Sequence, residues 1–122
     1  MKTILLIEDE AALQKTMGDA LGGAGYRVLQ ALDGEAGLRL ALSEKPDLIM
    51  LDLIMPHKTG FEVLAELKQN SAIKNLPVIV LTNLESMNDI EKALAAGAVT
   101  YLVKANYSLQ DVLNKIEQAI KN

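Results

Sequence analysis

The segment Leu48-Ile49-Met50-Leu51-Asp52 indicates the fold most directly, because an aspartate follows four consecutive apolar residues. Short continuous apolar runs are typical of parallel strands that are covered on both faces of their sheet. Four more short β-type runs, most of them continuously apolar, lie at Thr3–Ile7, Tyr26–Ala31, Val78–Leu81 and Thr100–Val103. We therefore predict five parallel strands, the third of them at Leu48–Leu51.

Segments with helical periodicity alternate with the predicted strands. Their apolar stripes comprise Leu13, Met17, Ala20 and Leu21, then Leu38 and Leu42, Leu64 and Leu67, Ile90 and Leu94, and finally Leu109, Val112, Leu113, Ile116 and Ile120. Apolar residues three or four positions apart share one face of a helix, and that face is buried against the core. Three helix starts are predicted by pairs with capping-box spacing, which are Thr59 with Glu62, Ser86 with Asp89, and Ser108 with Asp111.

Five strand–helix units in succession predict an α/β fold with a parallel sheet and helices on both faces. Right-handed crossovers make this a doubly wound, three-layer α/β/α arrangement. Known sheets of this size, such as those of flavodoxin-like folds, commonly have the strand order 2-1-3-4-5, and we expect that order here. The 122 residues suit a single hydrophobic core, so we expect one domain over residues 1–122.

Composition excludes several kinds of site. The chain has no cysteine, which rules out disulfides, thiolate ligands and cysteine nucleophiles, and its one histidine, His57, cannot form a histidine metal cluster. We expect His57 to be exposed in the loop Met55–Gly60. The formal net charge of −4 disfavours direct binding to nucleic acid.

No apolar run is long enough to span a membrane and no signal-peptide pattern is present, so we expect a cytoplasmic protein.

Polar residues follow four of the predicted strands. Glu8-Asp9, Asp52, Thr82 and Lys104 each come directly after an apolar run. The carboxyl ends of parallel strands open on one edge of a sheet, so these side chains are expected to converge there. Two carboxylates about 4 Å apart repel by roughly 4 kcal/mol at an effective dielectric of ~20. Such a cluster favours a hard divalent cation, and Mg²⁺ prefers a few carboxylates plus water.

Each of these residues alone also fits an ordinary structural role. Glu8 and Asp9 suit the start of the next helix, and Asp52 suits a turn before a proline. A threonine such as Thr82 is commonly a strand former, and a lysine such as Lys104 is commonly a solvated charge. The convergence of the whole set on one edge is what indicates a site, in which the Asp52 carboxylate is a candidate nucleophile toward an activated phosphoryl group.

In order and approximate spacing, these residues resemble the signature of bacterial response-regulator receiver domains, which also includes Met55-Pro56. The resemblance covers the whole chain and implies that Asp52 is the phosphorylated residue. It implies Mg²⁺ ligands at Asp9 and Asp52 directly, at Glu8 through water, and at the backbone carbonyl of Ile54. It also implies that Thr82 and Lys104 hold the phosphoryl oxygens. The phosphoryl donor would be a phosphohistidine of a sensor histidine kinase or of a phosphotransfer domain.

The resemblance extends to a switch. Tyr101 matches the family's aromatic switch residue, whose ring turns inward when the threonine, here Thr82, moves toward the phosphoryl group. The output would be a change in the face built by the fourth helix, fifth strand and fifth helix, which controls a downstream protein target. A tyrosine at position 101 also fits simple packing at the sheet edge.

The sequence departs from the family pattern at three points. Ala105 stands where the family usually has a proline after a cis peptide bond; a cis bond before a non-proline residue costs about 2.5–4 kcal/mol. Asn83 is larger than the usual residue and is expected to narrow access to the phosphoryl group. Ile54 and Leu84 are apolar where the family tunes hydrolysis of the acyl phosphate, so we predict slow self-dephosphorylation.

Three other classes of protein remain open. A phosphohydrolase of the haloacid-dehalogenase type also uses a strand-end Asp and Mg²⁺, although its usual second Asp would fall at Ile54. A flavodoxin-like binding module would need a phosphate-cradling loop where Glu8-Asp9 stands. A degenerate receiver would act only as an interaction module, which the complete acidic set disfavours.

Overall fold

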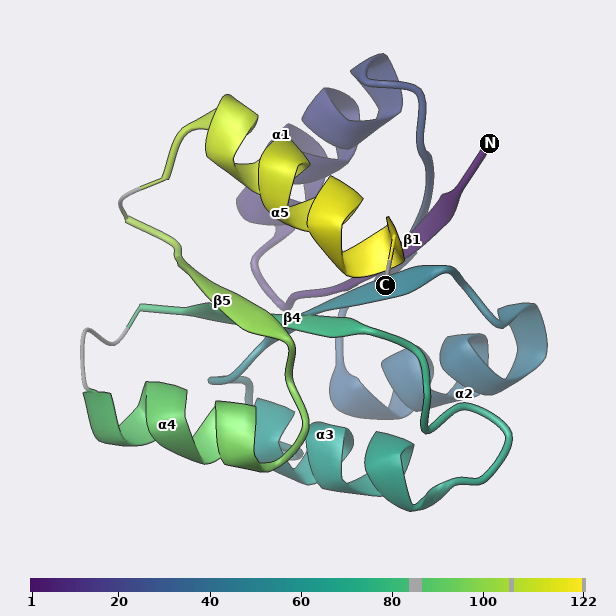
Figure 1. Cartoon of the computed structure of the whole chain (residues 1–122), viewed down its shortest axis with the longest axis vertical. Helices are drawn as coiled ribbons and strands as arrows, with labels where there is room; N and C mark the ends of the chain where they lie inside the picture. The colour runs from purple at the N-terminus through teal and green to yellow at the C-terminus, as the bar shows by residue number, and fades with distance from the viewer. Residues whose placement is uncertain (84–86, 106, 122) are drawn as a thin grey trace.

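The computed structural model describes residues 1–83, 87–105 and 107–121. The elements are β1 (Thr3–Ile7), α1 (Ala11–Gly23), β2 (Arg27–Ala31), α2 (Gly34–Glu44), β3 (Leu48–Asp52), α3 (Gly60–Gln69), β4 (Val78–Thr82), α4 (Met87–Ala95), β5 (Thr100–Val103) and α5 (Leu109–Lys121). All strand pairs are parallel and the order is β2-β1-β3-β4-β5, which confirms the predicted flavodoxin-like topology. Helices α1 and α5 cover one face of the sheet, and α2, α3 and α4 cover the other (Figure 1).

The continuous apolar runs are explained by two cores, one on each face of the sheet. In β1, Leu5 and Ile7 pack toward α2 and α3, whereas Ile4 and Leu6 pack toward α1 and α5. Because successive side chains in a strand point to opposite faces, a strand that is covered on both sides needs an apolar residue at every position. The same alternation decides on which side of the sheet the polar residue at each strand end emerges.

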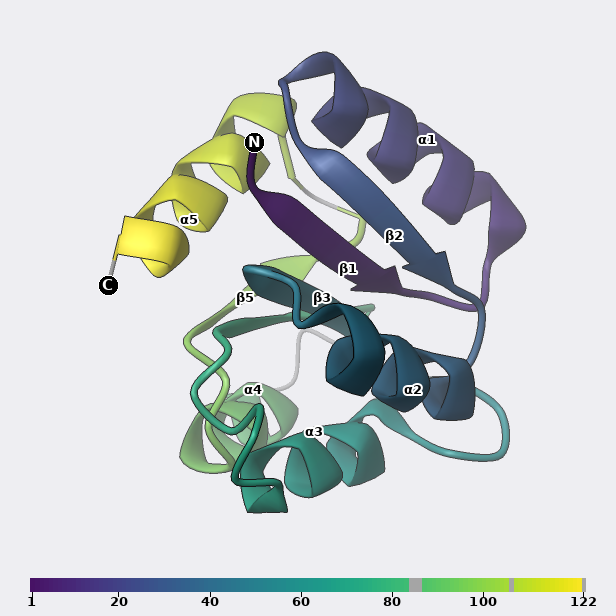
Figure 2. The ribbon, with the colours of Figure 1, turned by 90° about the vertical axis from the view of Figure 1, so that its right-hand side faces the viewer.

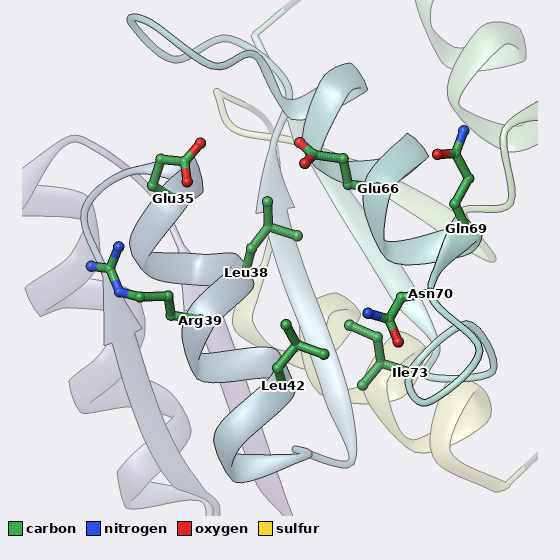
Figure 3. Close-up of a pocket in the computed structure, with 8 residues that line it drawn as sticks. All are labelled: Glu35, Leu38, Arg39, Leu42, Glu66, Gln69, Asn70 and Ile73. Atoms are coloured by element: carbon green, nitrogen blue, oxygen red, sulfur yellow. The ribbon is translucent and has the colours of Figure 1, made fainter.

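Helix α2 packs on the sheet differently from the prediction. Its buried line runs through Gly37 and Ala41, while Leu38 is half-buried and Leu42 is exposed. A Cβ on Gly37 would lie 2.5 Å from Cδ1 of Ile7, so the helix lies too close to β1 for a leucine to fit between them. The two leucines instead line a groove between α2 and α3 (Figure 3).

Two other helices also differ in part from their predicted stripes. Helix α4 buries Ile90 as expected but pairs it with Ala93, and Leu94 is exposed. Helix α1 buries Gln14, a polar residue, whereas Leu13 is only half-buried. The predicted apolar stripes of α3 and α5 are confirmed, except that Leu109 at the start of α5 is exposed.

The predicted helix starts can be compared where they are described. Thr59 and Glu62 form a complete capping box at α3. At α5, the backbone N–H of Asp111 donates to Oγ of Ser108 over 3.1 Å. Ser86, predicted to cap α4, lies outside the described residues.

Within the described part of the chain, no helix is both long and apolar enough to cross a bilayer.

Candidate functional site

Side chains of Glu8, Asp9, Asp52 and Lys104 gather at the carboxyl edge of the sheet, where β1, β3 and β5 end, and we call this cluster the acidic crevice. Every second residue of a strand points to the same face of the sheet. Counting in this way from the strand residues that face α1 and α5 leads to Glu8, Asp52 and Lys104, so these three side chains emerge on the same side of the sheet. Glu8 and Asp52 are almost completely buried, and Asp9 is exposed at the mouth of the crevice. The topology thus unites residues that lie far apart along the chain.

The carboxylates are arranged in a way that fits a divalent cation. One carboxylate oxygen from each of Glu8, Asp9 and Asp52 lies within 4.8 Å of the others. Oxygen donors at this spacing, with one ligand open to solvent, suit Mg²⁺, which binds a few carboxylates and retains several waters. At an effective dielectric of ~20, each ionised pair at this separation repels by roughly 3–4 kcal/mol, so the cluster calls for a cation.

Lys104 supplies a positive charge inside the crevice. Its Nζ lies 2.6 Å from Oε1 of Glu8 and 2.9 Å from Oδ2 of Asp52. A third carboxylate, that of Glu10, lies 3.2 Å from the same nitrogen. The backbone N–H of Lys104 donates to the carbonyl of Thr82 over 2.8 Å, which fixes the end of β5 against the end of β4. Lys104 is therefore held at both its backbone and its ammonium group.

The buried charges shift one another's protonation. Burial raises the pKa of Glu8 to about 7; the Lys104 ammonium opposes this shift and the neighbouring Asp52 adds to it. Burial also raises the pKa of Asp52, against the lowering effects of Lys104 and Glu8. Burial disfavours the charge on Lys104, but its contacts with Glu8 and Asp52 raise its pKa above the ordinary value. Burial therefore disfavours the ionised form of both carboxyl groups, and their contacts with Lys104 oppose this effect.

The loop after β3 orients Asp52 and returns close to it. The backbone N–H of Ile54 donates to Oδ1 of Asp52 over 3.1 Å, and the apolar side chain of Ile54 is 51% exposed. Farther along, the N–H of Gly60 donates to the carbonyl of Leu53 over 2.9 Å. A Cβ on Gly60 would lie 2.2 Å from the carbonyl oxygen of Asp52, so only glycine fits there.

The structure describes three further residues that the sequence singled out. His57 is exposed in the β3–α3 loop, as predicted, with a backbone φ of 69°. The peptide bond between Lys104 and Ala105 is trans, like the others in the described residues. Asn83 is exposed. Leu84, which we named as a tuner of hydrolysis, lies outside the described residues.

Thr82 and Tyr101 lie on the opposite side of the sheet from Asp52. The register pairs Tyr101 with Val80 and Thr82 with Val103, so the threonine and the tyrosine are diagonal neighbours on the side that faces α3 and α4. Thr82 is fully buried and Tyr101 is half-buried. Lys115 of α5 donates from Nζ to the Tyr101 carbonyl over 2.6 Å and lies 4.9 Å from the ring centroid. These contacts hold Tyr101 from the α5 side.

Sequence reasoning missed three residues that shape this site. Glu10 completes the carboxylate group around Lys104, Gly60 provides space behind Asp52, and Gln14 is buried beneath the β1–α1 connection. A signal for Glu10 was present, since it continues the acidic run after β1. The other two depend on contacts between distant segments, which periodicity does not reveal.

A second hollow lies away from the crevice, between α2 and α3. This groove of about 450 Å³ is lined by Leu38, Leu42 and Ile73 together with charged and amide side chains (Figure 3). Lys58, from the β3–α3 loop, bridges Glu35 of α2, at 2.9 Å, and Glu66 of α3. The bridge ties the loop that follows Asp52 to both helices.

Comparison with known proteins agrees with this geometry. Residues 4–117 match the response regulator receiver domain family. The "DNA-binding dual master transcriptional regulator RpaA" of Synechocystis sp. is 36% identical over 121 residues, which make up 99% of this chain and 50% of that protein. The chain thus spans about half the length of this curated relative.

Solved structures show the same architecture. A putative response regulator from Chloroflexus aurantiacus J-10-fl aligns with a TM-score of 0.94 and 26% identity, covering 99% of this chain and 98% of that one. The receiver domain of the sensor histidine kinase PA1611 from Pseudomonas aeruginosa PAO1, determined with magnesium in its active-site cleft, aligns with a TM-score of 0.91 and 28% identity, covering 99% and 98%.

A doubly wound sheet with a buried acidic crevice at its carboxyl edge defines a class of α/β proteins that bind ligands at strand ends. Within that class, this chain belongs to the response regulator receiver domain family. It is therefore a signalling domain of the two-component type and not a conventional enzyme. The phosphohydrolase alternative gains no support from these comparisons.

Proposed function

We propose that this domain is a magnesium-dependent phosphorylation switch whose phosphoryl acceptor is Asp52. The observation that carries the proposal is the position of the Asp52 carboxylate, buried at 2.9 Å from the Lys104 ammonium and within 4.8 Å of oxygens of Glu8 and Asp9. Asp9 and Asp52 would bind Mg²⁺ directly, Glu8 through water, and the Ile54 carbonyl would complete the protein ligands. When bound, the ion would neutralise charge on the transferring phosphoryl oxygens.

In the proposed reaction, a carboxylate oxygen of Asp52 forms a bond to phosphorus while the bond between phosphorus and a donor imidazole nitrogen breaks. The imidazole leaves with the electron pair and takes up a proton, and Asp52 becomes an acyl phosphate. Lys104, already beside Oδ2 of Asp52, would pair with a phosphoryl oxygen. Thr82, at the end of the neighbouring strand, would donate its hydroxyl to another.

The proposed switch follows from the charge that phosphorylation adds, about −1.5 to −2, with strong acceptor oxygens. Movement of Thr82 toward those oxygens would vacate space on the side of the sheet where Tyr101 lies. The ring would then turn inward and change the face formed by α4, β5 and α5, which would control a downstream protein. The phosphoryl group can shift the equilibrium between the two conformations only by the difference between its interaction free energies with them.

The proposed phosphoryl transfer also implies which molecules this domain would meet. The phosphoryl donor would be a phosphohistidine on a sensor histidine kinase or on a phosphotransfer domain, and both would meet this domain in the cytoplasm. RpaA is named as a DNA-binding regulator, whereas the net charge of −4 here disfavours direct contact of this domain with nucleic acid. We propose that residues 1–122 form one receiver domain that acts through protein contacts.

Transfer from a phosphohistidine-bearing phosphotransfer domain tests this function. We expect a Mg²⁺-dependent, stoichiometric loss of phosphate from the donor and a matching gain on this chain. Repeated turnover of small phosphomonoesters, with no phosphate retained on the chain, would favour a phosphohydrolase instead.

A further inference from the structure

Gln14 is a buried amide in the first turns of α1, only 3% exposed. Its Nε2 lies 2.9 Å from the carbonyl oxygen of Leu6, 3.1 Å from that of Glu8 and 2.8 Å from that of Ala31. The amide has two N–H bonds, so the three carbonyls share them. Gln14 thereby ties α1 to the ends of β1 and β2, which finish side by side next to the start of α1 (Figure 2).

The carbonyl of Glu8 belongs to the peptide group that joins Glu8 to Asp9. On the other side of Asp9, the N–H of Glu10 donates to Oε2 of Glu8 over 3.1 Å. Both peptide groups that flank Asp9 are therefore fixed, one by Gln14 and the other by the Glu8 side chain. Among the described residues, no side chain donates a hydrogen bond to the Asp9 carboxylate itself, so its direction depends on its backbone.

We propose that Gln14 is a positioning residue for the divalent-cation site, because its amide fixes the Glu8–Asp9 peptide and so aims the Asp9 carboxylate. This inference rests on the proposed function, in which Asp9 is a direct ligand. Groups that orient metal ligands typically change metal affinity by 10–100-fold when they are removed. An apolar residue at position 14 would fill the space but leave the Glu8 carbonyl without this donor.

The test compares Gln14→Met, Gln14→Asn and the matched control Gln30→Met by calorimetric titration of each whole chain with MgCl₂. Methionine keeps the length of glutamine but has no donor, and asparagine keeps the amide but withdraws it by one methylene. Gln30 donates to the backbone carbonyl of Gln14 over 3.3 Å, and among the described residues it forms no hydrogen bond with Glu8, Asp9, Asp52 or Lys104. We expect the Mg²⁺ dissociation constant to rise by about tenfold in both Gln14 variants and to stay unchanged in Gln30→Met.

A second readout separates positioning from stability alone. The rise in melting temperature on adding MgCl₂ reports affinity through the ratio of free Mg²⁺ to its dissociation constant, whatever the stability of the metal-free protein. We expect a smaller rise in melting temperature in the Gln14 variants. Adding Gln14→Met to Asp9→Asn should cause no further loss of Mg²⁺ affinity beyond that of Asp9→Asn alone. Should Gln14→Met fail to fold, Gln14→Asn decides the question in the same measurements.

The inference is overturned if both Gln14 variants fold and bind Mg²⁺ as tightly as wild type. Where Gln14→Met does not fold, wild-type affinity in Gln14→Asn overturns it. That result would leave the proposed function intact, because Asp9→Asn would still weaken binding. Equal Mg²⁺ binding by wild type and Asp9→Asn would instead overturn the ligand assignment in the proposed function, and the role of Gln14 with it.

Discussion

The ammonium nitrogen of Lys104 lies 2.9 Å from Oδ2 of Asp52, although the two residues are 52 positions apart in the chain. The contact joins the ends of β5 and β3 across β4, and the same nitrogen also lies 2.6 Å from Oε1 of Glu8. In the absence of a divalent cation, Lys104 is thus the positive charge that allows two buried carboxyl groups to face each other. A phosphoryl group on Asp52 would meet this ammonium without any long movement of the chain.

Replacing Lys104 should therefore destabilise the metal-free protein. Lys104→Met leaves Glu8 and Asp52 buried without their cation, and breaking a buried pair in this way costs about 3–5 kcal/mol. Urea unfolding in EDTA measures the loss, with Lys15→Met as the control because Lys15 pairs with Asp19 at an exposed site. The control should lose less than about 1 kcal/mol. Equal unfolding free energies for the two variants would contradict the assigned role of Lys104.

The raised pKa of Glu8 predicts a pH dependence of stability in EDTA. The folded protein holds the Glu8 proton up to a pKa of about 7, whereas the ordinary value for a glutamate is 4.5. The folded state therefore binds more protons in this window, and Glu8 makes stability fall as pH rises from about 4.5 to 7. Glu8→Gln should remove this contribution and flatten the unfolding free energy between pH 5 and 8. Parallel profiles for wild type and Glu8→Gln would show that the Glu8 proton is not bound in this way.

Gly60 should not tolerate a side chain. In Gly60→Ala the new Cβ would lie 2.2 Å from the carbonyl oxygen of Asp52, so the backbone behind the acceptor must move. We expect a loss of about 1–3 kcal/mol in the free energy of unfolding, together with slower phosphorylation. Gly22→Ala is the matched control, because no atom beyond its chain neighbours and the backbone of its own helix lies within 4 Å of the new Cβ, and alanine favours a helix. A Gly60→Ala protein as stable as Gly22→Ala would show that the loop has room to spare.

The apolar residues at the two tuning positions predict a long-lived acyl phosphate. Ile54 is half-exposed beside Asp52 and offers no hydrogen bond to an attacking water. Introducing polar groups at the two tuning positions, with Ile54→Asn and Leu84→Glu combined, should speed decay of the aspartyl phosphate in Mg²⁺ by about tenfold or more. Mass spectrometry over time measures the decay. Wild-type decay as fast as that of the double variant would contradict the prediction.

The strands, and the gathering of Glu8, Asp52 and Lys104 at one edge of the sheet, could be predicted because both depend on local sequence. A strand covered on two faces must be apolar throughout, so the polar residue that ends it is conspicuous, as Asp52 is after Leu51. Parallel topology then places all such ends on one edge. The convergence of Glu8 and Lys104 on Asp52 follows from this rule without any knowledge of distances.

Other features could not be predicted, because they depend on how closely elements approach each other. Helix α2 turns Gly37 and not its leucines toward Ile7, and that contact is invisible to a hydrophobicity pattern. Periodicity marked Leu13 as a core residue of α1, whereas its neighbour Gln14 is buried instead and donates from Nε2 to carbonyls of β1 and β2. A polar residue with such distant partners reads as a surface residue in the sequence.

Treatment with acetyl phosphate, followed by intact-mass measurement, tests the central claim most directly. We predict that wild type gains one phosphate in MgCl₂ and none in EDTA, that Asp52→Ala gains none in either, and that hydroxylamine removes the group, as expected for an acyl phosphate. A phosphate that persists in Asp52→Ala, or one that forms equally well in EDTA, would contradict the account.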